Sequence, residues 1–225
     1  MEIMDEAVQQ ATALQGPATK YQATDGKDGI PSEQVESLAA GLADASQKDT
    51  DQQKAVELVG KLTVQQNEKM AEGTALIQKT RQAVKGKYGE HDEVINKAFH
   101  IGTEMPKTVK KMRSELKYQQ TVVMEHKTDL GPHGMKDTDI ASFAGIEADL
   151  ASIDKDQENA KKLQKAATQA RNDSMKSLHK TMRKIQHTAR SIFAGQPLVL
   201  IEFESIANAG GGKSKPPAPP DQPKQ

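Results

Sequence analysis

Two long, charged stretches of the 225-residue chain constrain its fold more than any other feature. They span residues 51–88 and 156–193, and in each one apolar residues recur every three or four positions. That spacing is typical of a helix with one apolar face, and about 37 helical residues would extend for roughly 55 Å. A single helix of this kind cannot bury its apolar face by itself, so partner helices are required.

We call the apolar face of each stretch its seam. The seam of the first comprises Ala55, Leu58, Leu62, Gly73, Ile77, Thr80 and Val84, and that of the second comprises Ala160, Leu163, Ala167, Ala170, Leu178, Met182, Ile185, Ala189 and Ile192. Such spacing predicts bundle packing. Because Gln65, Gln66 and Lys69 occupy the middle of the first seam, we expect loose packing there.

The two stretches also match each other when the chain is shifted by about 105 positions. Asp51 then falls on Asp156, and Leu58 falls on Leu163. Helices rich in Ala, Lys and Gln can align by composition alone, but matching Asn, Met and Gly residues favour a duplication. We therefore predict helical repeats at residues 32–105 and 137–206, joined by a connecting helix and turn at 106–136 without a counterpart.

The remaining segments are shorter. Residues 1–31 are predicted to be a mobile arm, with a short helix over 2–15 that Gly16 and Pro17 end. Weak capping patterns favour breaks near 46–50 and at Asp154, although either helix could instead continue through. Residues 198–203 favour a strand by propensity, whereas the repeat favours a helix with Pro197 in its first turn; we predict the helix. Residues 207–225, rich in Gly, Pro and Lys, are predicted to be a disordered tail.

Few aromatic residues (3%) and the lack of Trp argue for thin seams between helices rather than a thick core. The lack of Cys excludes disulfides, thiolate zinc sites and Cys nucleophiles. The predicted fold is all-α: an elongated antiparallel helical bundle built from two repeated helical hairpins, with disordered termini. The acidic start lacks the apolar core of a secretory signal and no stretch is long enough to span a membrane, so we expect a cytoplasmic protein.

No catalytic pattern stands out. Gly212-Lys213-Ser214 resembles part of a phosphate loop, but Ala207 replaces the first Gly and the following Pro residues prevent the required helix. The six His residues lack the spacing of a helical metal site, and the Glu-x-x-His pattern of di-iron bundles does not occur. We therefore expect a protein that is not an enzyme and that binds no cofactor.

One cationic surface is the main candidate site. We define the basic stripe as the exposed cations expected opposite the second seam: Lys162, Lys165, Lys176, Lys180, Arg183, Lys184 and Arg190. It can be a solvated face, or it can pair with the acidic residues of positions 1–53. It can also bind phosphates of nucleic acid or anionic lipid, although aromatic residues for base stacking are missing.

The resulting functional expectation is a structural or protein-interaction protein that binds a protein partner or itself. The alternative is anion binding through the basic stripe, with nucleic acid possible but not favoured. Residues 216–220 contain a PxxP pattern, which suits either an SH3-like partner or a spacer.

The junction from Gln82 to Phe99 resembles a set of uncharacterised bacterial proteins. In these a long helix ends in a Tyr/Phe-Gly turn, followed by a short apolar helix ending in Phe and a basic, Pro-rich tail. Tyr88-Gly89 and Phe99 fit one copy, and Gly195, Phe203 and the tail fit the other. This chain lacks the second Gly that usually follows the Phe. The resemblance implies an all-helical fold and no particular activity.

Overall fold

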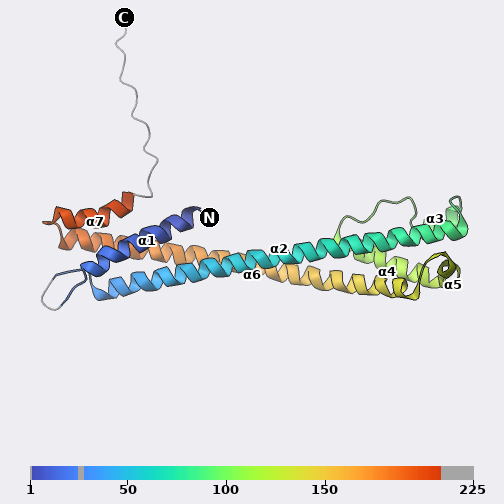
Figure 1. Ribbon diagram of the computed structural model, residues 1–225, viewed down its shortest axis with the longest axis horizontal. Coiled ribbons are helices and arrows are strands. Elements are labelled where there is room, and N and C mark those ends of the chain that lie inside the picture. Colours follow the sequence, from blue (N-terminus) through green and yellow to red (C-terminus); the bar gives the residue numbers. More distant parts are fainter. Residues whose placement is uncertain (1, 25–27, 209–225) are drawn as a thin grey trace, which may run out of the picture. The chain divides into compact units, whose positions relative to one another are not determined.

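The computed structural model describes residues 2–24 and 28–208, and the side chains of residues 6–24 and 28–204 (Figure 1). Its helices are α1 (Glu2–Lys20), α2 (Ser32–Tyr88), α3 (Glu93–Ala98), α4 (Val109–Glu125), α5 (Lys127–Leu130), the 3-10 turn η1 (Gly131–His133), α6 (Asp137–Ile192) and α7 (Pro197–Asn208). Within these ranges β structure is limited to isolated bridge residues, including the parallel pair of Gln22 and Ile30. The predicted all-α class is therefore confirmed, while most of the predicted tail and its PxxP pattern lie outside the described residues.

The chain divides into two compact units: unit 1 consists of residues 1–53 and 166–225, and unit 2 of residues 54–165. The long helices α2 and α6 contribute to both, and they run antiparallel in each (Figure 1). In unit 2, Lys79 lies 2.7 Å from Asp139, whereas Thr63 lies 3.0 Å from Gln157. Position numbers thus fall along α6 as they rise along α2, which confirms the antiparallel bundle.

Unit 1 has its own apolar core, formed by α1, α7 and parts of the two long helices. Its buried residues are Ala11, Leu14, Ala18, Ile30, Val35, Leu38, Ala45, Leu178, Met182, Ile185, Ala189, Phe193 and Phe203. Gly41 permits a close approach of α6, because a Cβ added there would lie 3.2 Å from Leu178 Cδ1 and 4.0 Å from Leu178 Cα. The second predicted seam is therefore buried over this part of α6.

One expectation for the N-terminal arm was wrong. Helix α1 continues through Pro17 to Lys20, and Leu14 and Ala18 are fully buried. Pro17 cannot donate a backbone hydrogen bond, which weakens the helix. The burial of Leu14 and Ala18 on either side of Pro17 offsets this loss. The described part of the following loop is also packed: Ile30 is buried, and its N–H donates to the Tyr21 carbonyl at 2.8 Å.

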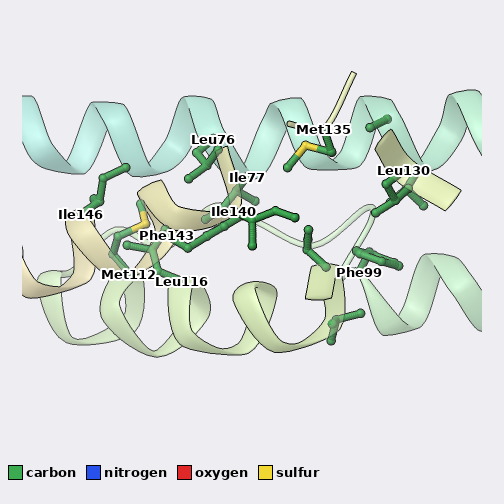
Figure 2. Close-up of a cluster of buried hydrophobic side chains, with 14 of the residues drawn as sticks. Leu76, Ile77, Phe99, Met112, Leu116, Leu130, Met135, Ile140, Phe143 and Ile146 are labelled. Carbon is green, nitrogen blue, oxygen red and sulfur yellow. The ribbon is translucent and has the colours of Figure 1, made fainter. Parts of the chain in front are cut away.

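Unit 2 has a second core between α2, α4 and the first half of α6. Figure 2 shows Ile77 of α2, Met112 of α4 and Phe143 of α6 meeting there. Phe99 and Leu130, from the segments after α3 and at the end of α5, are also fully buried in this cluster. A Cβ added at Gly73 would lie 3.1 Å from Met112 Sδ, so the glycine lets α4 approach α2 closely.

The predicted helix breaks near residues 46–50 and at Asp154 were also wrong, because α2 and α6 each continue without interruption. Near Thr50, the polar groups that suggested capping are satisfied within α2. Thr50 Oγ1 donates to the Ser46 carbonyl at 3.0 Å, and Gln53 Nε2 donates to Asp49 at 2.7 Å. Neither site contains Pro or Gly, so nothing forces the backbone out of the helical conformation.

The segments that follow the two long helices are both helical. Asp92 caps α3 by accepting from the Ile95 N–H at 3.0 Å, and α7 is a helix that begins at Pro197. Gly89 follows α2 with a left-handed φ of +82°. At the start of α6, the Asp139 carboxylate accepts from the Lys136 N–H at 2.8 Å.

Helix α4 is fixed to α6 by a half-buried ion pair, with Arg113 Nε 2.8 Å from Glu147 Oε1. Burial alone raises the pKa of Glu147, but hydrogen bonds from Arg113 and Lys117 outweigh it and hold this pKa below its usual range. The charged form therefore stays bound to α4 at neutral pH. Among the described helices, none is both long and apolar enough to cross a membrane.

Truncation of the unit 2 core tests this packing. Phe143 is fully buried, so we expect Phe143→Ala to lower the free energy of unfolding by about 3–5 kcal/mol. Val94→Ala is the control, because Val94 is 78% exposed and its truncation should change stability by less than about 0.5 kcal/mol. Urea titration followed by circular dichroism measures both, and equal effects would contradict the core assignment.

Candidate functional site

The basic stripe lies on the exposed side of α6. All seven of its residues are exposed, and in unit 1 the opposite face buries Leu178, Met182, Ile185 and Ala189. Lys180 follows Leu178 by two positions, about 200° around the helix, which accounts for this separation. Lys162 and Lys165 belong to unit 2, whereas the other five residues belong to unit 1.

The stripe pairs little with the rest of the described protein. Lys176 lies 3.5 Å from Asp173 on its own helix, and Arg190 lies 3.1 Å from Glu204. Among described side chains, Lys180, Arg183 and Lys184 form no ion pair. The acidic N-terminal region instead uses Arg171, whose Nη1 lies 3.8 Å from Asp49. Pairing of the stripe with described acidic residues of positions 1–53 is therefore not observed.

A cleft in unit 2, which sequence reasoning missed, is the other candidate site. It has a volume of about 750 Å³ and lies between the loop that follows α3 and the first turns of α4. Its lining includes His100, Met105, Pro106, Lys110, Lys111 and Tyr118. The loop is fixed to α2 because Arg81 donates to the Thr103 carbonyl at 3.1 Å and to Thr103 Oγ1 at 3.0 Å.

His100 is the most constrained residue of the cleft. Its φ of +50° is left-handed, an uncommon conformation for a non-glycine residue. Its ring stacks on Tyr118 with centroids 4.4 Å apart and planes 7° apart. Nδ1 lies 2.9 and 3.0 Å from the two Glu115 carboxylate oxygens. These contacts hold the imidazole in one orientation.

The partners of His100 are themselves held in place. Gln119, which is fully buried, donates through Nε2 to Glu115 at 2.8 Å and to the Phe99 carbonyl at 3.0 Å. The Tyr118 hydroxyl donates to the Ala98 carbonyl at 2.9 Å. With Nδ1 occupied by Glu115, the second ring nitrogen of His100 has no hydrogen-bond partner among the described residues, so it can bind a ligand in the cleft.

Among the described side chains, no group of three or more His, Asp or Glu residues lies close enough together to hold a metal ion. Comparisons with protein-family models, curated proteins and solved structures found no match to this chain. The resemblance at the two helix junctions therefore stays a prediction.

The cleft was missed for a physical reason. His100 and Glu115 lie on different elements, and no periodicity relates a residue after α3 to one inside α4. Pro106 favours the start of the connecting helix, but it gives no indication of how the preceding loop folds. The left-handed conformation of His100 has no sequence signal at all.

Proposed function

We propose that this protein is a non-enzymatic helical interaction protein that self-associates through a thin segment of unit 2. The thin segment comprises residues 54–72 of α2 and residues 151–165 of α6. No residue of the α2 part is buried, and in the α6 part only Gln157 and Ala160 are. Apolar side chains there remain accessible to water, which is the observation that supports the proposal best.

The exposed side chains are large aliphatic ones. Val56 is 43% exposed, Leu58 42%, Val64 56% and Leu163 60%. Single exposed aliphatic residues are common, but here four occur where the two helices lack the buried contacts of the unit 2 core. A pair of helices buries less of each helix than a four-helix bundle does. A helix pair from a partner would therefore cover the apolar side chains that α2 and α6 leave exposed.

A second copy of the chain is the partner that fits this segment. The Glu57–Lys61 ion pair at 2.7 Å balances charge along this part of α2, so the segment carries no strong single-sign repulsion there. The segment is roughly 28 Å long and 20 Å wide, which gives an interface of about 550 Å² on each copy. That is slightly below the usual size of a specific interface, and we therefore expect a weak, reversible dimer.

The repeated hairpins belong to the same proposal, and we infer a longer repeat than the sequence suggested: α1–α2–α3 and α4–α6–α7. Buried residues recur at the same spacing of about 105 positions in both. Ala11 corresponds to Leu116, Ala18 to Val123, Ile30 to Met135 and Leu38 to Phe143. The connecting helix then has a counterpart after all, in α1.

Matching ring clusters support this repeat. In unit 1, Tyr21 lies 5.5 Å from Phe193 and 6.0 Å from Phe203. In unit 2, His126 occupies the position equivalent to Tyr21 and lies 5.8 Å from Tyr88 and 5.4 Å from Phe99. A duplicated hairpin provides two similar helical modules within one chain, an arrangement that suits a structural or interaction role.

Charge substitution in the thin segment tests self-association. Sedimentation velocity over a concentration series should detect a dimer with a dissociation constant on the order of 100 µM. Leu58→Glu with Leu163→Glu should weaken it at least about tenfold, because the dimer would bury unpaired carboxylates. Circular dichroism should remain unchanged, since both residues are exposed in the single chain.

Val94→Glu is the matched control, because Val94 is an exposed aliphatic residue of unit 2 outside the thin segment. This variant should dimerise like the unmodified protein. A chain that stays monomeric at all concentrations would contradict self-association. A dimer weakened by Val94→Glu but not by the paired substitution would contradict the proposed surface.

The second candidate function is anion binding through the basic stripe, favoured by the exposure of Lys180, Arg183 and Lys184 without acidic partners among the described side chains. On our main proposal, a mobility assay with duplex DNA shows no retardation even at low salt. Retardation with a steep salt dependence would favour the stripe instead. Replacing these three residues with Gln should then reduce the slope of log binding constant against log salt concentration by about three. Replacing Lys54, Lys61 and Lys155 with Gln should leave that slope unchanged.

A further inference from the structure

We propose that the cleft beside His100 binds a small phosphate monoester with an apolar or aromatic body. This inference does not depend on the proposed self-association, because the cleft and the thin segment involve different residues. The cleft volume of about 750 Å³ lies in the range typical of small-molecule sites.

The charge of the cleft selects an anion. Lys107, Lys110 and Lys111 all line it. Lys107 has a partner in Glu104 at 3.2 Å, but both side chains are at least 80% exposed and the pair is weak. Lys110 and Lys111 form no ion pair with any described residue. Their two charges match a phosphate monoester, which carries nearly two negative charges at neutral pH, better than they match a single carboxylate.

Of the two acidic residues that line the cleft, Glu104 pairs with Lys107, and Glu115 forms no ion pair with Lys110 or Lys111. Glu115 lies within 3.0 Å of His100 Nδ1 and accepts from Gln119 at 2.8 Å, so its oxygens are already engaged. The same contacts orient the imidazole, and when both ring nitrogens are protonated the second one can donate to a phosphate oxygen. A strained backbone held by several contacts is common where a side chain must be positioned for binding.

Apolar groups also line the cleft. Met105 and Pro106 line it beside the ring of Tyr118, which is 39% exposed. Inorganic phosphate alone would leave these surfaces in contact with water, whereas an ester with an apolar or aromatic group would cover them. A ligand with both a phosphate group and an apolar group therefore matches the lining better than a ligand with only one of the two.

The test uses the full chain and three probes: phenyl phosphate, inorganic phosphate and phenol. Nuclear magnetic resonance of the histidine side chains follows binding, and His100→Asn assigns the His100 signals. Phenyl phosphate should shift these signals in a saturable manner and bind more tightly than either other probe. Lys110→Gln with Lys111→Gln should weaken this binding about tenfold, since two charge-assisted contacts are lost.

The control is Lys155→Gln with Lys162→Gln, which removes the same charge from exposed positions of α6 in the same unit. Its affinity for phenyl phosphate should equal that of the unmodified protein. The proposal is overturned if phenyl phosphate gives no saturable shift of His100, if both double variants lose affinity equally, or if phenol binds as tightly as its phosphate ester.

Discussion

The antiparallel pairing of α2 with α6 is the interaction on which the rest of the structure depends. Each helix carries an apolar seam, and neither seam can be buried without the other helix. Glycines bring helices close where packing is tightest: Gly41 faces Leu178 in unit 1, and Gly73 faces Met112 in unit 2. Shorter helices then complete each core, α1 and α7 in unit 1 and α4 in unit 2. In the thin segment of unit 2, only Gln157 and Ala160 are buried, and aliphatic side chains remain exposed.

These packing differences separate the surfaces that could carry function. The thin segment leaves Leu58 and Leu163 accessible, and hydrophobic association is the physical effect that it can supply. The basic stripe is a positively charged surface without a defined pocket, so charge is the only means by which it can attract anions. The cleft combines a fixed imidazole, unpaired lysines and an apolar wall, which is the combination expected of a small-molecule site. Self-association and ligand binding thus rest on separate residues and can be tested separately.

The sequence predicted the fold class, the long helices and the exposure of the stripe, because each follows from the helical spacing of apolar residues. It did not predict that α2 continues past Thr50, since the same side chains can cap a helix or bond within it. Gly16 and Pro17 predict an end to α1, and the sequence does not show that Ala18 is buried, since that burial depends on contacts distant in the chain. The cleft could not be predicted for the same reason: His100 meets Glu115 only after the loop has folded against Arg81.

A cysteine pair tests the antiparallel pairing most directly, since the natural chain contains no Cys. A Cβ at position 41 would lie 4.0 Å from the Cα of Leu178, which is compatible with disulfide geometry. After mild oxidation, Gly41→Cys with Leu178→Cys should form an intramolecular disulfide, detected by mass spectrometry and as a monomer on a non-reducing gel. Gly41→Cys with Lys176→Cys should not, because Lys176 lies on the exposed face. No disulfide in the first variant, or one that links two chains, would contradict the pairing of α2 and α6 within one chain.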